Sequence, residues 1–331
     1  MTSNRRSTRR RQFLAGSALL VTGWPLFAMA QAAYPQRPIT IVVPLSAGGV
    51  TDVVARYLAQ HMSEDWKVPV VVENKLGAGG SVAAEYVAKA PPDGYTLIMG
   101  TVSSHAINPS LYPSLRYDNL KSFEPVSLVA SGPNMLVVHP SVPVKTVAEL
   151  VQYLKANPDK LTYGSTGVGT STHVLAELFK MTTGTQMIHV PYKGSSQMMT
   201  DLTSGQIQLA FDNMPTALAQ VRADKLRPLA ISSATRWADT PEIPTIAETL
   251  PGFVATSWQG LFAPAGTPPE ILDRLSAEVQ RILKTPEAVR RFNDLGTNAT
   301  SMPRDAFRRF VQDETTRWAD VVKKSGARVD G

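Results

Sequence analysis

The sequence predicts an α/β protein with two lobes, each built from β-strands that alternate with α-helices, and a ligand cleft between the lobes. Short apolar or β-branched runs alternate with segments in which apolar residues recur at helical spacing. This alternation is interrupted near residue 131 and then starts again. Strands that alternate with helices imply parallel sheets covered on both faces, and such sheets bind ligands beyond the carboxyl ends of their strands.

The first lobe begins with a continuous apolar run of strand length at residues 39–43. Apolar residues between Val50 and His61 then recur at intervals of three and four, which indicates a helix that buries one face. The same reasoning predicts a strand at residues 69–72, a helix at 81–90 and a strand at 95–100.

The crossing between the lobes is predicted where two apolar runs, residues 125–130 and 134–139, lie nearly end to end around Ser131-Gly132-Pro133. The pattern then predicts helices at residues 147–155, 171–181 and 195–204, and strands at 161–164, 187–190, 207–211 and 226–232. Residues 235–251 are expected to be irregular, 258–263 a last strand, and 269–284, 286–295 and 304–324 helices that open near prolines. We expect lobe 1 to comprise residues 33–131 and 255–331, and lobe 2 residues 132–254.

The first 32 residues have the layout of a cleaved export signal. Five arginines are followed by an apolar run from Phe13 to Ala30 and by small residues at the expected cleavage site. Arg10-Arg11 followed by Gln12-Phe13-Leu14 resembles a twin-arginine signal, with the ordinary secretory route as the alternative. Gly16, Gly23 and Pro25 interrupt the run, which is marginal for the alternative of a membrane-spanning helix. We therefore expect a periplasmic protein.

Composition excludes several function classes once this leader is set aside. The chain has 33 basic and 27 acidic residues, and the leader holds five arginines and no acid, leaving 28 basic against 27 acidic residues. A basic nucleic-acid footprint is therefore not expected. The absence of Cys excludes disulfides and thiol catalysis, and the five His do not occur at metal-binding spacings. We expect neither a metal nor a cofactor.

The turn PLSAGGVTD, Pro44 to Asp52, joins the first strand to its helix. It lacks the Lys and hydroxyl pair of a phosphate loop, the GxGxxG of a dinucleotide site and the GxSxG of a nucleophile elbow. Ala47, Gly48 and Gly49 are instead expected to present backbone N–H groups to a carboxylate or phosphate at the helix start. A tight turn without a ligand is the alternative, and Asp52 is expected chiefly to support the first helical turn.

The second lobe has a counterpart at Tyr163 to His173, which follows a strand and opens a helix with several hydroxyl residues. His173 is expected to pack or cap rather than to catalyse, since no nucleophile and acid are paired with it. The glycine loop at residues 77–81 is expected to be a structural turn at a sheet edge. Four other polar residues follow strands and are expected to face the cleft: Thr101, Ser103, Lys193 and Asp212.

Six segments, in order and over nearly the whole mature chain, resemble the Bug-type receptors, the extracytoplasmic solute-binding proteins of tripartite tricarboxylate transporters. They are YPQRPI (34–39), PLSAGGVTD (44–52), ENKLGAGGSVAAEYVAKAPPDGYTLIMGT (73–101), YGSTGVGTSTH (163–173), VPYKGSSQMMTDLTSGQI (190–207) and LFAPAGTP (261–268). The resemblance implies a two-lobed, type II periplasmic-binding-protein fold with two Rossmann-like lobes. It also implies that backbone amides, hydroxyls and ordered water, rather than an Arg, bind a small carboxylate.

Carried onto this chain, the resemblance implies ligand contacts from Ser46, Ala47, Gly48, Gly49 and Asp52 and from Ser165, Thr166, Gly169, Thr170 and His173. Leu45 departs from the family, which commonly has an aromatic residue there. The expected function is a non-enzymatic, monomeric receptor that closes on an organic acid and delivers it to membrane transporter subunits. The acid is left open among dicarboxylates, tricarboxylates, amino acids and aromatic acids. A ligand sensor that reports to a sensor kinase is the alternative, and an exported hydrolase would need a nucleophile that the sequence does not reveal.

Overall fold

The computed structural model describes residues 34–325, so the expected export signal lies outside the described residues. The part of the chain up to the first long strand forms β1 (Ile39–Val43), α1 (Val50–Trp66), β2 (Val70–Asn74), η1 (Ala78–Gly80), α2 (Ser81–Ala88), β3 (Thr96–Thr101), η2 (Ser103–Ile107), α3 (Asn108–Leu111) and β4 (Phe123–Val138). Nearly every strand and helix predicted in this part is present within a few residues of its expected bounds.

The remaining elements follow the predicted alternation. They are α4 (Val147–Ala156), β5 (Thr162–Ser165), α5 (Ser171–Thr183), β6 (Ile188–Pro191), α6 (Ser195–Thr203), β7 (Leu209–Asn213), α7 (Met214–Arg222), β8 (Arg227–Ile231), η3 (Ile246–Glu248), β9 (Thr256–Pro264), α8 (Pro269–Leu283), α9 (Pro286–Asp294), β10 (Asn298–Ala299) and α10 (Arg304–Ser325). Helix α7 was not predicted.

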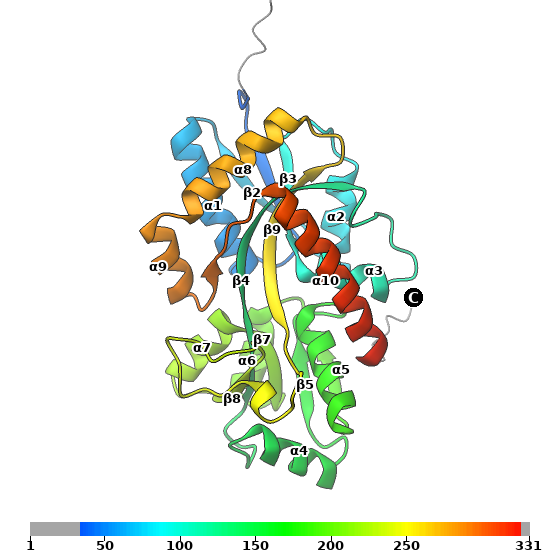
Figure 1. Cartoon of the computed structure of the whole chain (residues 1–331). Coiled ribbons are helices and arrows are strands. Elements are labelled where there is room, and N and C mark those ends of the chain that lie inside the picture. The colour runs from blue at the N-terminus through cyan, green and yellow to red at the C-terminus, as the bar shows by residue number, and fades with distance from the viewer. Residues whose placement is uncertain (1–33, 326–331) are drawn as a thin grey trace, which may run out of the picture. The chain divides into compact units, whose positions relative to one another are not determined.

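The strands form one curved sheet in two halves, with the order β2-β1-β3-β9-β4-β7-β5-β6. We call β2, β1, β3 and β9 with the first part of β4 the first half-sheet, and the last part of β4 with β7, β5, β6 and β8 the second half-sheet (Figure 1). Strand β4 belongs to both, because Phe123 to Pro133 pair with β9 and Asn134 to Val138 pair with β7. The two apolar runs expected to be separated by a crossing are therefore one continuous strand of 16 residues.

The sheet is mixed, whereas the sequence pattern predicted parallel sheets. Strand β1 pairs in parallel with β2 and β3, and β5 pairs in parallel with β6 and β7. The long strands β4 and β9 run antiparallel to their neighbours β3 and β7, because they carry the chain from one half-sheet to the other and back. Parallel strands thus point their carboxyl ends toward the junction of the two half-sheets, and the loops that follow them meet there.

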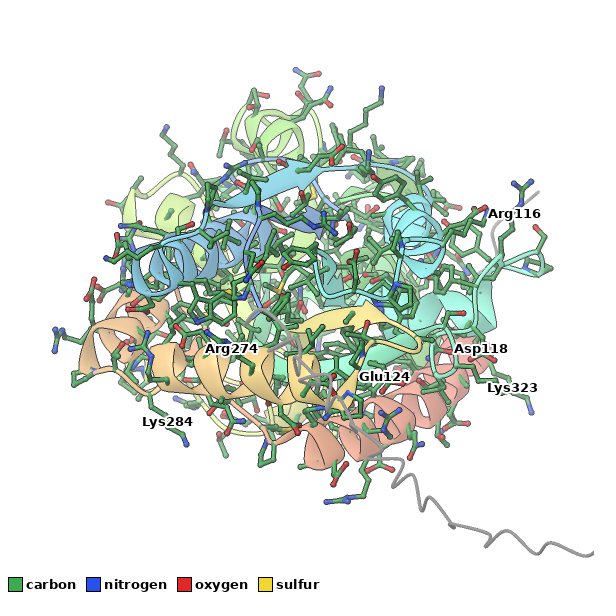
Figure 2. The ribbon with its side chains drawn as sticks, turned by 90° about the horizontal axis from the view of Figure 1, so that it is seen from above. Arg116, Asp118, Glu124, Arg274, Lys284 and Lys323 are labelled. Carbon is green, nitrogen blue, oxygen red and sulfur yellow. The ribbon has the colours of Figure 1, made fainter. Side chains whose placement is uncertain are left out.

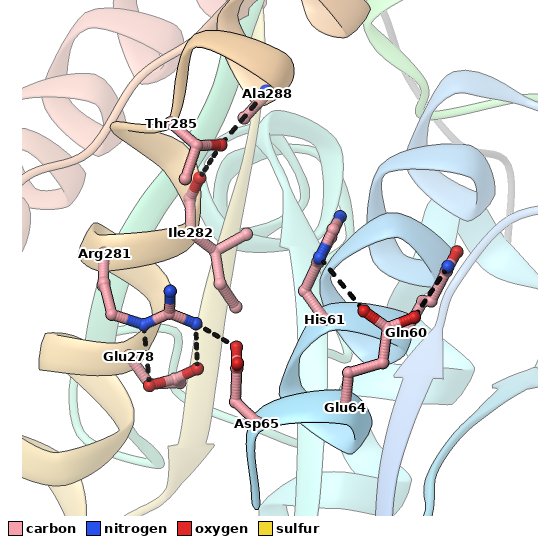
Figure 3. Close-up of polar contacts among 9 residues, drawn as sticks. All are labelled: Gln60, His61, Glu64, Asp65, Glu278, Arg281, Ile282, Thr285 and Ala288. Atoms are coloured by element: carbon pink, nitrogen blue, oxygen red, sulfur yellow. Dashed lines mark hydrogen bonds and ion pairs between the residues drawn. The ribbon is translucent and has the colours of Figure 1, made fainter.

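Helix α1 illustrates how the sequence builds the cover of the first half-sheet. Val54, Leu58 and Met62 follow one another at intervals of four and are fully buried. Burial of such a side chain contributes roughly 1.5–3 kcal/mol. Figure 3 shows the polar side of the same helix, where Asp65 is ion-paired with Arg281 of α8 and Arg281 also pairs with Glu278 at 2.9 Å.

Helix α10 covers both half-sheets on one face, and in Figure 1 it runs from beside β9 down to α5. Its buried Glu314 accepts hydrogen bonds from the indole nitrogens of Trp258, at 2.9 Å, and Trp318, at 3.0 Å. Arg317 donates to the other oxygen of the same carboxylate at 3.0 Å. A buried carboxylate with these three donors ties the C-terminal helix to β9. Across residues 34–325, no helix has the length and apolar character needed to cross a membrane.

Candidate functional site

The loop after β1 is supported from behind by a hydrogen-bonded network. Asn74, the last residue of β2, donates from Nδ2 to the carbonyl oxygen of Leu45, at 2.9 Å, and to Oδ1 of Asp52, at 3.0 Å. The N–H of Gly48 donates to Oδ2 of Asp52 at 3.0 Å, and Nε of Arg56 donates to the same oxygen at 2.9 Å. Asp52 therefore links the loop, α1 and β2.

This network shows where two of the expected site residues make their hydrogen bonds in the described structure. Asp52 is buried, and its carboxylate oxygens serve the loop rather than an open site. Burial opposes its ionisation, but the hydrogen bonds from Arg56, a backbone amide and Asn74 outweigh burial and hold the pKa of this carboxyl below its usual value. The N–H of Gly48, expected to face a ligand, points to Asp52 instead, and that of Gly49 donates to the carbonyl oxygen of Ser46 at 3.4 Å. Of the three residues expected to present amides, Ala47 and Gly48 are exposed and Gly49 is half-buried.

The loop after β5 is likewise held by its own hydroxyl groups. The N–H of Thr166 donates to Oγ1 of Thr172 at 2.9 Å, and Oγ1 of Thr170 donates to the carbonyl oxygen of Gly167 at 2.7 Å. The buried Ser165 places Oγ 2.7 Å from Nε2 of His189. These bonds fix the shape of the loop immediately before the first turn of α5.

His173 lies behind this loop. Its Nδ1 accepts the N–H of Gly169 at 3.4 Å, and its ring stacks on that of His189 with centroids 4.4 Å apart. Burial lowers the pKa of His173, so the imidazole is neutral at neutral pH. The residue therefore supports the loop, in line with the expectation that it packs rather than catalyses.

The glycine loop after β2 lies against the other half of the molecule, contrary to the expectation of an isolated structural turn. A Cβ built on Gly79 would lie 3.2 Å from the backbone of Gly169. Although β2 is the edge strand, its following loop turns inward, where Nδ2 of Asn108 donates to the carbonyl oxygen of Gly79 at 3.1 Å. The error arose because the position of a strand in the sheet does not determine where its loop ends.

Two hydrogen bonds join the half-sheets next to this contact. Ser103, after β3, accepts the N–H of Ser171 in the first turn of α5 at 3.2 Å. The hydroxyl of Tyr112 donates to the carbonyl oxygen of Val168 at 3.3 Å. Thr101 is buried and takes part in a local turn, in which its N–H donates to Oγ of Ser104 at 3.0 Å. Ser103 is thus at the junction, whereas Thr101 shapes the turn that presents it.

Ser46 and Gly194 form a further close contact between the two sides. A Cβ added to Gly194 would lie 2.2 Å from Oγ of Ser46, so the loops after β1 and β6 touch here. Two cavities open on either side of this contact, one of about 420 Å³ that includes Leu45 and Lys193 and one of about 520 Å³ that includes Gly48 and Ser195. We call them the front cavity and the back cavity, respectively.

The front cavity collects most of the loops singled out in the sequence. It is lined by Pro44, Leu45, Leu76, Gly77, Ala78, Gly79, Gly80, Tyr112, Thr166, Gly167, Val168, Thr170, Tyr192 and Lys193. Lys193 is exposed and is the one charged residue among these described lining residues. Asp212 does not line it, because its carboxylate accepts from Ser195 at 2.9 Å and from Thr216 and so joins β7 to α6 and α7. Burial raises the pKa of Asp212 to about 6.

The electrostatics of the junction come largely from the backbone. Helices α1 and α5 begin there without a hydrogen bond from the side chain of their N-cap residue, Gly49 and Thr170. Helices α4 and α9, which begin elsewhere, do have such a bond, but α8, which also begins elsewhere, does not, so an uncapped start is not particular to the junction. An uncapped helix start carries roughly half a positive charge and attracts anions. Charged side chains instead project from the outer surface, as Arg116, Lys284 and Lys323 do in Figure 2.

Several residues of this site were not predicted from the sequence. Asn74 and Arg56 fasten the first loop, Tyr112 joins the first half-sheet to the loop after β5, and His189 holds Ser165. Asn74 ends β2, shortly after the apolar residues of that strand, and this position could have identified it. Arg56 lies inside α1, Tyr112 directly follows α3 and His189 lies on the edge strand β6, and none of them has a local signal.

Comparisons with known proteins agree with this geometry. The family model described as "Tripartite tricarboxylate transporter family receptor" matches residues 54–327. Protein BugT of Bordetella pertussis is 38% identical over 298 residues, which cover 89% of this chain and 91% of that protein. The structure described as R. palustris Rpa4515 with adipate superposes with a TM-score of 0.87 at 39% identity, covering 90% of this chain and all of that one. MatC (Rpa3494) from Rhodopseudomonas palustris with bound malate gives 0.83 at 35% identity, covering 87% of this chain and all of that one.

Proposed function

Because the chain belongs to the tripartite tricarboxylate transporter receptor family, whose members are binding receptors and not enzymes, we propose that it captures a small organic acid at the junction of the two half-sheets. In this proposal the acid enters the front cavity and is delivered to the membrane subunits of a transporter. The expected site residues act in two groups. Thr170 lines the front cavity and faces the acid, Ser46 and Ala47 belong to the same loop as the lining residue Leu45, and Asp52, Ser165 and His173 hold these loops.

The observation that carries this proposal is the front cavity itself. Its volume of about 420 Å³ lies in the usual range of small-molecule sites. It is lined by loops of both half-sheets, and its described lining contains a lysine and no carboxylate. The start of α5 lies at this cavity, because its N-cap residue Thr170 is part of the lining and makes no side-chain capping bond. An anion is therefore the ligand whose charge this arrangement stabilises, and a carboxylate needs no Arg there.

The lining also favours acids with an apolar body. Leu45, Leu76 and Val168 contribute apolar side chains, and Tyr112 and Tyr192 contribute rings. Leu45 stands where related sequences commonly have an aromatic residue, which leaves room for a chain or ring of the ligand. We propose an aliphatic or aromatic acid rather than a tricarboxylate. The ionised carboxylates of a tricarboxylate would have a single cation to pair with, because Lys193 is the one cation of the described lining.

Lobe closure is part of the proposal. We assign residues 33–131 and 255–331 to one lobe and residues 132–254 to the other, with β4 and β9 as the connecting strands. The contact between Ser46 and Gly194 belongs in this scheme to the closed state, which the ligand favours by bridging both loops. A monomer in solution with a radius of gyration that falls when ligand is added would support this scheme.

Export and delivery are proposed from the sequence and the family. We propose that residues 1–32 direct the chain to the periplasm by the twin-arginine route and are then removed. Replacement of both Arg10 and Arg11 by Lys should leave uncleaved precursor in the cytoplasm, and unchanged export would assign the ordinary secretory route. Co-purification with a sensor kinase instead of transporter subunits would assign the receptor to signalling.

A thermal-shift screen of the mature protein tests the ligand class. The acids are hexanoate, adipate and benzoate as apolar-bodied candidates and malate and citrate as polar comparisons. A ligand at about 100 times its dissociation constant adds roughly 2.7 kcal/mol to the free energy of unfolding. Citrate as the strongest stabiliser would contradict the apolar lining argument, and no shift with any acid would contradict carboxylate capture.

A further inference from the structure

His189 is a half-buried polar residue of β6. It belongs neither to the motifs singled out in the sequence nor to the proposed ligand contacts. Its ring lies between two others, with centroids 4.7 Å from Tyr163 at an interplanar angle of 14° and 4.4 Å from His173 at 18°. We call these three rings the imidazole stack. The stack lies directly behind the loop that lines the front cavity from Thr166 to Thr170.

Each imidazole of the stack is bonded to this loop. Nε2 of His189 lies 2.7 Å from Oγ of Ser165, and Nδ1 of His173 accepts the N–H of Gly169 at 3.4 Å. Oγ of Ser165 already accepts the N–H of Gly167 at 3.2 Å. With one lone pair of Ser165 Oγ taken by this N–H, we assign the hydroxyl proton to the bond with His189, in the tautomer whose Nε2 is an acceptor.

From this geometry we infer that His189 and His173 are positioning residues, whose unprotonated ring nitrogens hold the loop at residues 165–170 in the shape that binds the ligand. This inference rests on the proposed function for its consequence, because the loop matters as the wall of the front cavity. The bonds themselves do not depend on a ligand. They can therefore be tested in the ligand-free protein.

The surroundings of the stack keep both rings neutral. The charged groups that face it come from α5, where Glu177 accepts from the hydroxyl of Tyr163 and pairs with Lys180 at 2.9 Å. Burial, with a smaller contribution from the neighbouring imidazole of His173, lowers the pKa of His189 to about 4, and the opposed effects of Glu177 and Lys180 are smaller still. A protonated His173 could not accept the Gly169 N–H, so acidification should loosen the loop.

Two substitutions at one position separate the possible roles of His189. In His189→Gln, an amide oxygen can reach the place of Nε2 and accept from Ser165 without a titrating group. In His189→Phe, the ring still stacks but the acceptor is lost. His139→Phe is the matched control, because Nδ1 of His139 also lies 2.7 Å from a serine hydroxyl, that of Ser141, away from the front cavity.

Hydrogen–deuterium exchange of the ligand-free mature chain measures the outcome. We expect backbone exchange in peptides covering residues 165–173 to become about tenfold faster in His189→Phe, the change that corresponds to about 1.4 kcal/mol, and to stay near the wild-type rate in His189→Gln. In His139→Phe these peptides should exchange as in the wild type. Wild-type exchange in a folded His189→Phe would overturn the inference.

Ser165→Ala provides a second route if His189→Phe does not fold. It removes the other partner of the same bond and also the acceptor of the Gly167 N–H, so the same peptides should exchange faster, and by more than in His189→Phe, while the rings keep their stack. Unchanged exchange in folded Ser165→Ala would also overturn the inference. If the loop loosens as expected but no acid binds the wild type, the proposed function fails while the positioning role stands.

Discussion

Gly194 is the position where a single methyl group should most directly oppose the contact between the two sides of the cleft. A Cβ there would lie 2.2 Å from Oγ and 3.2 Å from Cβ of Ser46, whereas ordinary contacts are at least 3.4 Å. The loops must therefore separate by about 1 Å, or the Ser46 hydroxyl must rotate away. Gly194 also has a φ of +149°, a conformation that L residues rarely adopt.

Gly194→Ala is therefore expected to have two separable effects. The unfavourable backbone conformation should lower the free energy of unfolding by about 1–3 kcal/mol. The clash acts only when the loops meet, so affinity for the acid identified in the thermal-shift screen should fall at least about tenfold, or about 1.4 kcal/mol. Calorimetric titration measures the affinity, and chemical denaturation measures the stability.

Two further variants make the reasoning refutable. Gly184→Ala is the control for backbone strain, because Gly184 has a φ of +63° and a Cβ there would meet nothing within 4 Å. It should lose stability but keep its affinity. Ser46→Ala combined with Gly194→Ala removes the clashing oxygen and should restore part of the affinity. Wild-type affinity in Gly194→Ala would refute the conclusion that this contact belongs to the ligand-bound state.

Three other outcomes are expected. Lys193→Gln should weaken acid binding several-fold, and the loss should be larger at low salt, whereas Lys225→Gln in the back cavity should leave the affinity unchanged. Calorimetric titration of both variants identifies the cavity that binds the acid, and the reverse result would assign it to the back cavity. Asn74→Ala removes the donor to the Leu45 carbonyl and to Oδ1 of Asp52, so it should lower the free energy of unfolding by about 1–3 kcal/mol in urea denaturation. An unchanged midpoint would exclude this support. Burial lowers the pKa of His105 to about 3, so the imidazole takes up a proton in the unfolded chain before it does so in the folded one. The free energy of unfolding should therefore fall as the pH drops from about 6.5 toward 3, and it should fall less in His105→Phe. An equal fall in both proteins would assign the effect to other groups.

Most strands and helices of this chain were predictable because their signals are local. The apolar run at Ile39–Val43 and the helical spacing of Val54, Leu58 and Met62 depend only on neighbouring residues. Helix α7 was not predicted, because it follows β7 directly at Met214 and lacks a loop to announce it. The direction of β4 and β9 was also missed, because an apolar strand pairs equally well with parallel and antiparallel neighbours.

The candidate site was predictable only in part. The two glycine-containing turns after β1 and β5 were identified from their place between a strand and a helix, and both line the front cavity. The role of their polar groups was not identified. Asp52 was expected at a helix start, but only its distance to Gly48 and Asn74 reveals that it holds the loop from behind.

By itself, the sequence determined most strands and helices, the turns that follow the carboxyl ends of the parallel strands, and the absence of thiol chemistry. Each of these depends on residue type and on near neighbours in the chain. Only the tertiary structure decided which groups meet. Gly79 reaches Gly169, Ser46 reaches Gly194, and His189 reaches Ser165 through the arrangement of strands. Such partners are 24 or more residues apart, and their distances follow from how the two half-sheets share β4, which no local pattern encodes.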